Sequence, residues 1–247
     1  MKMNKQKIRS LLILTAFMFS LFSSAQSASE ILEKMDEVMY ASKDQKSVTT
    51  IVLTDRNGKT RERKAVIMQK GRHMRLTRFT APASQAGIGF LSLPGEVMYV
   101  YLPAFKKERR IATHVKNQNF AGTDFTYEDM EAKPYSEKYI PELKETLSDQ
   151  YILILKPKPG IRSDYARLVL YVDRNNFYMK RVEYFTRAGV KAKELVSTFE
   201  QKQGYWTPVV MEMTDLKKQH KTRMIMTEIS FDNNFSDEEF TVRKLKQ

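Results

Sequence analysis

The sequence has 247 residues, with 42 lysines and arginines against 29 aspartates and glutamates, and it contains no cysteine. Its length allows one large domain or two small ones, and its hydrophobic content of 42% excludes disordered and collagen-like proteins. The absence of cysteine excludes disulfides, thiolate metal sites, thiol nucleophiles and lipid attachment through cysteine.

The first 25 residues have the three parts of a secretory signal peptide. Basic residues between Lys2 and Arg9 precede an apolar run from Leu11 to Phe22, and small residues follow up to Ala25. The apolar run is shorter than the ~20 residues of a membrane span. We therefore predict a signal peptide over residues 1–25, cleaved near Ala25, and one exported domain over residues 26–247.

The net charge of +13 bears on the binding partner. In an exported protein, a basic surface favours an anionic lipid surface or ligand over nucleic acid. The lysines and arginines are scattered and form no run, so a surface charge that only aids solubility explains them equally well.

An amphipathic helix is predicted directly after the signal peptide. Ser29 is its candidate N-cap, and apolar residues recur at helical spacing up to Met39. The apolar stripe of this helix consists of Ile31, Leu32, Met35, Val38 and Met39.

From Lys46 the apolar period falls to two, which predicts β-strands joined by turns such as Asn57-Gly58. The strand patterns cover residues 46–53, 60–70, 74–79, 88–93, 97–102, 109–112, 151–155, 165–172, 177–185, 190–199, 205–216 and 221–231. The only long interval without one is Thr113 to Leu147, where Tyr127 to Met130 can form a helical turn behind Thr126. Because neighbouring strands form hairpins, we predict a mostly β fold: a single curled antiparallel sheet, an incomplete barrel of about eleven strands, with a short helical lid.

Patterns for catalysis or metal binding are weak in this sequence. The three histidines are His73, His114 and His220, and none has a second ligand at metal-binding spacing. A nucleophile elbow and a phosphate-binding glycine loop are both missing. We therefore predict no catalytic residue, no metal site and no cofactor.

A group of acidic residues lies in the interval from Thr113 to Leu147: Asp124, Glu128, Asp129 and Glu131. Aspartate and glutamate in a first helical turn are common caps, and we favour this interpretation. The alternative is a hydrolase with Asp124 and Asp129 as its acid pair, since two carboxylates can cleave a glycosidic bond.

Methionines in the last strands indicate an apolar cavity. Met211 and Met213 share one face of their strand, and Met224 and Met226 share one face of the next. Methionine adapts to varied apolar ligands, although it also fills cores. Little material is left to fill a large concave sheet, which favours an open groove. The expected ligand-binding residues are Met98, Leu168, Leu170, Val209, Met211, Met213, Ile225 and Ile229.

The run from Phe120 to Met130, with the sequence FAGTDFTYEDM, resembles the outer-membrane lipoprotein-sorting protein family, relatives of the periplasmic carrier LolA. The stretches from Met98 to Pro103 and from Arg109 to Ile111 also look like this family. The resemblance covers nearly the whole mature chain. It implies an incomplete barrel like those of LolA, LolB and LppX, with a lid over an apolar cavity that carries lipoprotein acyl chains or other lipids across the periplasm.

The same resemblance implies partners and covers. The partners would be acyl chains, an inner-membrane donor and an outer-membrane acceptor, and we expect a monomer that binds no nucleic acid. The covers would be the helix, with Ile31, Met35 and Val38, and the motif loop, with Phe120, Gly122, Asp124, Phe125 and Asp129. Gly122 would permit a turn, Asp124 would cap amides, and Phe125 would anchor the loop.

The interval from Thr113 to Leu147 is longer than in the archetypal carrier of this family. Two alternatives therefore stay open. One is a carrier or accessory protein for a free lipid or hydrophobic product that a membrane exporter handles. The other is a protein-binding module that transports nothing.

Overall fold

A 13-stranded antiparallel sheet forms the body of the computed structural model, which describes residues 26–247. Its strand order is β6-β5-β4-β3-β2-β1-β13-β12-β11-β10-β9-β8-β7, so the first and last strands pair at the centre. The first six are β1 (Asp44–Thr54), β2 (Thr60–Lys70), β3 (Met74–Ala81), β4 (Gly89–Leu93), β5 (Val97–Leu102) and β6 (Lys107–Arg110). The others are β7 (Tyr139–Thr146), β8 (Gln150–Pro157), β9 (Tyr165–Asp173), β10 (Met179–Thr186), β11 (Lys191–Lys202), β12 (Tyr205–Asp215) and β13 (His220–Phe231).

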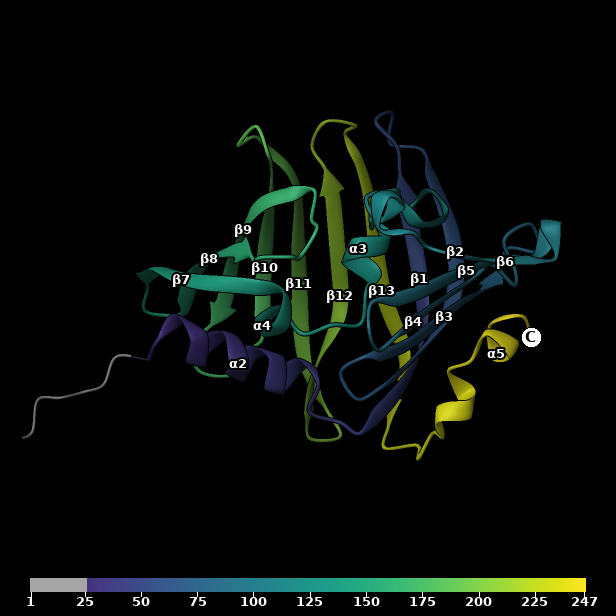
Figure 1. Cartoon of the computed structure of the whole chain (residues 1–247), viewed down its shortest axis with the longest axis horizontal. Coiled ribbons are helices and arrows are strands. Elements are labelled where there is room, and N and C mark those ends of the chain that lie inside the picture. Colours follow the sequence, from purple (N-terminus) through teal and green to yellow (C-terminus); the bar gives the residue numbers. More distant parts are fainter. Residues whose placement is uncertain (1–25) are drawn as a thin grey trace, which may run out of the picture.

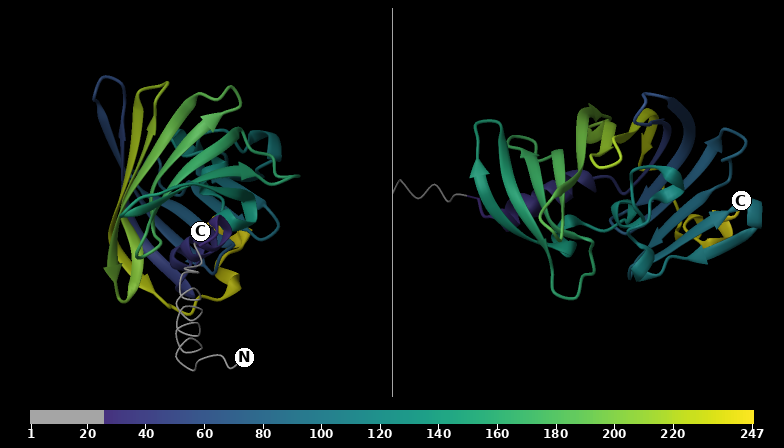
Figure 2. Two further views of the ribbon diagram at one scale, coloured as in Figure 1. Left: turned by 90° about the vertical axis from the view of Figure 1, so that its left-hand side faces the viewer. Right: turned by 90° about the horizontal axis from the view of Figure 1, so that it is seen from above.

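The sheet curls around the middle of the molecule, and its outer strands β6 and β7 do not meet (Figures 1 and 2). The predicted single curled antiparallel sheet is therefore confirmed. It has 13 strands where about eleven were expected. The strand that the sequence patterns missed is β7, because Pro141 and its charged neighbours hide the apolar alternation of an exposed edge strand. The predicted signal peptide lies outside the described residues.

Helix α2 (Ala28–Met39) lies across the β7 side of the curl (Figure 1). Its N-cap is Ser27 and not Ser29, because Ser27 and Glu30 form a capping box in which each side chain accepts the other's amide. Ile31 and Met35 are fully buried, whereas Val38 is half-buried. The stripe of apolar residues therefore packs against the sheet as predicted.

The interval from Thr113 to Lys138 fills part of the curled sheet. It contains the short helices η2 (Thr113–Val115), η3 (Phe120–Gly122), α3 (Tyr127–Met130) and α4 (Tyr135–Lys138). The predicted helical turn behind Thr126 is confirmed as α3. A large core cluster joins this interval to both halves of the sheet, with Phe120 in contact with Phe79 and Phe90.

The C-terminal segment forms a second, smaller core with β3 and β4. It follows β13 through η4 (Asp237–Glu239) to α5 (Val242–Leu245), and it buries Phe240 and Leu245 against Leu76 and Leu91. A Cβ atom on Gly89 would lie 2.6 Å from Leu245 Cδ1, so a larger residue here would force the buried Leu245 side chain to shift. Among residues 26–247, no helix has the length and apolar character to cross a bilayer.

Candidate functional site

A cavity of about 180 Å³ lies between the concave face of the sheet and the segment that covers it. Its cover includes the end of α2 at Met39 and the segment from Phe125 to Tyr139. By the same measure, a site for one water molecule occupies only ~10–15 Å³. The cavity therefore has room for part of a small ligand.

One wall of the cavity is apolar and rich in methionine. It consists of Leu168, Met179, Leu195, Met211, Met224 and Met226, from strands β9 to β13. Met211 of β12 pairs with Met224 of β13, which places both side chains on the concave face. A flexible, polarizable surface of this kind adapts to apolar chains of varied shape.

The opposite wall is polar and comes from β1, β2 and β3. The register aligns Gln45, Gln69 and Arg75 across these three strands. Arg75 donates from Nη2 to Gln69 Oε1 at 2.6 Å and from Nη1 to the Met130 carbonyl at 3.3 Å. No ion pair joins Arg75 to a carboxylate within residues 26–247. Arg75 therefore ties the sheet to the cover and keeps an unneutralised positive charge beside the cavity.

Two threonine hydroxyls in the lining have no hydrogen-bond partner. Thr77 is 1% exposed and Thr207 is 2% exposed, and both line the cavity. Neither Oγ1 atom finds a donor or acceptor within the described part of the chain. A buried hydroxyl without a partner costs about 1–3 kcal/mol, so a polar ligand atom that bonds to one would bind favourably.

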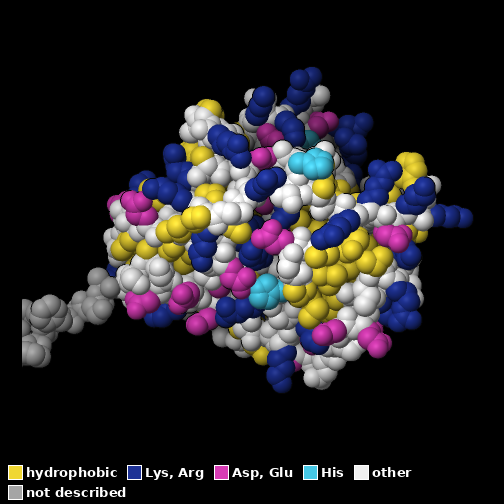
Figure 3. Space-filling view, in the orientation of Figure 1, with side chains coloured by type: hydrophobic (Ala, Val, Ile, Leu, Met, Phe, Trp, Pro, Cys, Tyr) yellow, Lys and Arg dark blue, Asp and Glu magenta, His cyan; other side chains and the backbone are white. Residues whose placement is uncertain are grey.

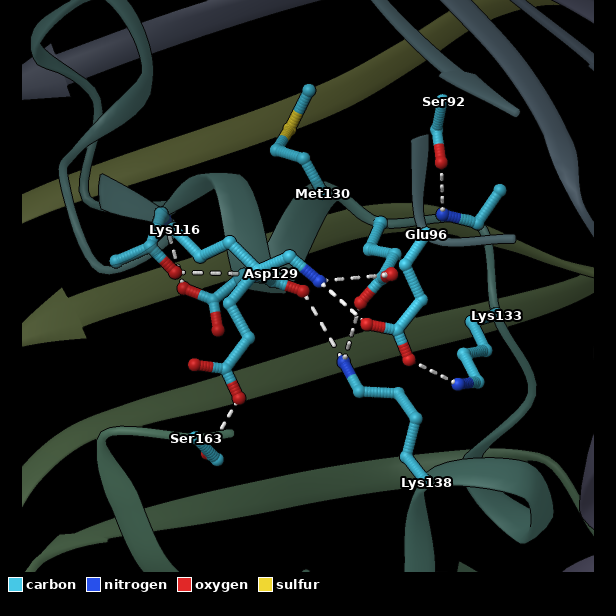
Figure 4. A network of polar contacts seen from close by, with 12 residues as sticks. Ser92, Glu96, Lys116, Asp129, Met130, Lys133, Lys138 and Ser163 are labelled. Carbon is cyan, nitrogen blue, oxygen red and sulfur yellow. Dashed lines mark hydrogen bonds and ion pairs between the residues drawn. The ribbon is translucent and has the colours of Figure 1, made fainter. Parts of the chain in front are cut away.

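The cover holds an unusual group of buried charges (Figure 4). Glu131, whose side chain is 5% exposed, pairs with Lys116 at 3.4 Å and Lys138 at 3.6 Å. Lys116 also reaches Glu96 at 3.2 Å, and Lys138 donates to the Glu128 carbonyl at 3.3 Å. Buried charges need such partners, because an unpaired charge in the interior is very costly.

Two buried carboxylates, one in α3 and one in α2, have raised pKa values. Burial raises the pKa of Glu128, although nearby Lys138 and the Ser163 hydroxyl oppose the shift. Burial also raises the pKa of Asp36 in α2, although it accepts amide bonds from Tyr135 at 3.0 Å and Ser136 at 2.7 Å. Asp36 therefore joins helix α2 to helix α4, and so connects the two parts of the chain that cover the cavity.

The carboxylates of the motif loop hold the loop in place. Asp129 and Thr126 form the capping box of α3, so the predicted cap is present. Among the described residues, the Asp124 carboxylate accepts no hydrogen bond from a backbone amide. Its Oδ2 accepts instead from the Thr222 hydroxyl and contacts His220 Nδ1, each at 2.7 Å. The predicted amide cap is therefore wrong. The sequence could not indicate Thr222 and His220 as partners, because they lie in β13, almost 100 residues away.

The other predicted cover residues lie inside or beside the large core. Phe120 is buried among aromatic rings, and Phe125 is buried at the edge of the cavity. Gly122 has a φ of +75°, as the predicted turn requires. Within residues 26–247, no group of three or more histidine, aspartate or glutamate residues is placed to hold a metal ion.

The eight predicted ligand-binding residues fall into three groups. Leu168 and Met211 line the cavity. The fully buried core contains Met98, Leu170 and Met213. The third group is half-buried and does not line the cavity; it consists of Val209, Ile225 and Ile229. Ile225 pairs with Val210 and so faces away from Met211, while register shifts in β12 and β13 break the period of two.

The polar wall was not predicted. Its signal in the sequence is a set of polar residues at inward positions of β1 to β3, such as Gln69 and Thr77 beside the apolar Ile67. Such positions look like the solvent face of a strand until the curl of the sheet is known.

Solved structures with the same fold belong to lipoprotein-sorting and related proteins. A domain assigned to the outer membrane lipoprotein-sorting proteins, from Vibrio parahaemolyticus, has a TM-score of 0.81 at 24% identity, over 89% of this chain and 98% of that one. A DUF1329 family protein from Desulfovibrio piger has a TM-score of 0.82 at 26% sequence identity, over 88% of this chain and 97% of that one. A LolA superfamily protein from Nitrosomonas europaea has a TM-score of 0.75 at 22% sequence identity, over 89% of this chain and 100% of that one.

Sequence comparison adds a family but no function. No curated protein matches the chain. A family model described as an uncharacterized protein matches residues 71–247, which is more than half of the chain. The chain therefore belongs to the family of that model, and its resemblance to the LolA-like outer-membrane lipoprotein-sorting proteins is confirmed.

Proposed function

We propose that the protein is a periplasmic carrier that binds lipoprotein acyl chains or other lipids in its cavity and moves them toward the outer membrane. The observation that carries this proposal is the methionine-rich wall on the concave face, beneath a cover of α2 and the motif loop. An acyl chain gains ~0.8 kcal/mol for each CH₂ group that leaves water, so shape-tolerant apolar contact is enough to hold it.

The two walls together favour an amphiphilic cargo. Its chain would lie on the methionine wall, and its polar atoms would reach Thr77 or Arg75 on the opposite wall. The cover fills part of the concavity, which restricts the size of the cargo. This restriction supports the alternative of a free lipid, handled together with a membrane exporter, as a second candidate.

Release of the cargo requires the cover to move. Arg75 and Asp36 hold the cover through hydrogen bonds to Met130, Tyr135 and Ser136. We expect a donor at the inner membrane to supply cargo to the open form and an acceptor at the outer membrane to remove it.

We propose no catalytic role for the acidic residues. Asp124 is bonded to Thr222 and His220, and Asp129 is bonded to Thr126. Both carboxylates therefore already have structural partners, which speaks against the acid pair of a hydrolase.

Replacement of Met211 by glutamine tests the cavity. Met211→Gln places an amide on the apolar wall, so we expect its affinity for a fluorescent fatty acid to fall about tenfold, since burial of a polar group without a partner costs ~1–3 kcal/mol. The matched control is Ile225→Gln in the neighbouring strand, which faces the other side of the sheet and should leave the affinity unchanged. Displacement titrations measure both.

A result in which Met211→Gln melts much earlier but binds normally per folded molecule would identify the methionines as core filling. Native mass spectrometry of the protein from its own periplasm is the complementary measurement. A protein that never carries lipid would support the protein-binding module instead.

Export is tested by N-terminal sequencing of the mature protein. We expect it to begin near Gln26, because the sequence before this point has all three signal-peptide regions. An intact Met1 in the membrane fraction would remove the argument for the periplasm.

A further inference from the structure

The β5–β6 hairpin presents an exposed aromatic ring at its tip. Phe105 closes the short helix η1 (Pro103–Phe105), and 63% of its surface is exposed. This hairpin lies at the β6 end of the molecule, away from α2 (Figure 1). Single exposed apolar residues are common on protein surfaces, but Phe105 is the only exposed aromatic residue within residues 26–247, and it lies next in sequence to several cations.

Four exposed cations follow this ring in the sequence, and three of them lie in β6. Lys106 and Lys107 follow it directly, and Arg109 and Arg110 follow Glu108. Within residues 26–247 none of the four forms an ion pair, whereas Glu108 pairs with Lys246 at 3.5 Å. The cations are therefore free to meet an external anion. We call residues 103–110 the basic hairpin.

The C-terminal segment adds one cation to this side of the molecule. The Lys246–Glu108 pair joins the residue after α5 to β6, and within residues 26–247 the exposed Arg243 of α5 forms no ion pair, whereas Lys244 pairs with Glu239 at 3.4 Å. Lysine and arginine side chains are prominent at this end of the space-filling view (Figure 3).

Protection of an edge strand explains part of this arrangement. β6 pairs only with β5, and charged residues on such an edge prevent pairing with other chains. This role needs the charges but not an exposed phenylalanine. The ring stands in η1, outside the strand, where it protects no edge.

We propose that the basic hairpin docks the protein on an anionic lipid bilayer. The Phe105 ring enters the headgroup region, and the four cations bind lipid phosphates. An apolar ring flanked by lysine and arginine suits this interface, because the ring leaves water while the charges stay at the anionic surface. The inference does not rest on the cargo of the cavity, since the hairpin lies outside the lining.

The test is co-sedimentation of the protein with vesicles. We expect binding to vesicles of two parts phosphatidylcholine and one part phosphatidylglycerol, little binding to phosphatidylcholine alone, and weaker binding at high salt. The double variant Arg109→Gln with Arg110→Gln should lower the partition coefficient about 25-fold, since each cation contributes about fivefold. Phe105→Ser should lower it about fivefold.

Val190→Ser is the matched control. Val190 is 62% exposed in the turn between β10 and β11, on another part of the sheet, and its replacement should leave vesicle binding unchanged. Because all these positions are exposed, each variant should melt like the parent and bind a fluorescent fatty acid like the parent.

Four results would overturn the proposal: equal binding to neutral vesicles, unchanged binding by the arginine variant, unchanged binding by Phe105→Ser, or an equal loss with Val190→Ser. Equally strong binding to polyglutamate would also overturn it, because the surface would then be merely cationic. Failure of fatty-acid binding in the parent would contradict the carrier proposal alone.

Discussion

Glu131→Gln is expected to lower the free energy of unfolding by about 3 kcal/mol. The change leaves the amino group of Lys138, whose side chain is 10% exposed, without its only carboxylate within 4.0 Å in the described chain. Removal of one member of a buried ion pair is costly because the remaining charge has lost water and keeps no opposite charge; Lys138 would retain only its hydrogen bond to the Glu128 carbonyl. Lys116 loses less, since it keeps Glu96.

Denaturant unfolding measures this loss, and an exposed pair provides the control. Lys156 and Glu142 lie 3.3 Å apart with both side chains 63% exposed, so Glu142→Gln should change the midpoint little. Equal shifts for the two variants would mean that water reaches Glu131 and that the cover is looser than its contacts indicate.

Phe120→Ala is expected to cost about 4 kcal/mol of stability. The Phe120 ring is 2% exposed, and its centroid lies 5.4 Å from that of Phe79, 5.7 Å from Phe90 and 5.9 Å from Tyr127. Its removal leaves a cavity that these rings cannot close, because they belong to different elements. Thermal and denaturant melting measure the effect.

The exposed Phe105 supplies the comparison for this prediction. Phe105→Ala removes a ring of the same size from the surface and should leave stability within about 0.5 kcal/mol of the parent. If Phe120→Ala melts no earlier than Phe105→Ala, the Phe120 ring does not anchor the motif loop to β3 and β4.

Local patterns in the sequence predicted most strands and the helical turn α3, because these elements have a clear apolar period or a capping residue of their own. The period of two identified the long hairpins, and Thr126 as the residue before a helical turn placed α3 correctly. The edge strand β7 escaped detection because an edge has little apolar alternation to show. The N-cap was misplaced by two residues because Ser27 and Ser29 are both suitable, and only Ser27 has a glutamate three residues later.

The cavity was less predictable because it depends on contacts between distant strands. A period of two shows which residues share a face but not which face is concave. Met211 and Met224 pair with each other and both line the cavity, so their face of β12 and β13 is the concave one and Ile225 faces the other side. The partners of Asp124 and Arg75 likewise come from segments that only the folded sheet brings together.

The pairing of β1 with β13 at the centre of the sheet has a consequence for how the chain folds. These strands lie at opposite ends of the described sequence, and their register extends from Gln45 opposite Phe231 to Thr54 opposite Lys221. The central seam can therefore form only after the last strand has been synthesised and released. Such long-range closure slows folding to the range of milliseconds to seconds. Until then, both halves expose unpaired edges, and a chaperone that binds unfolded chains would have its longest opportunity at this step.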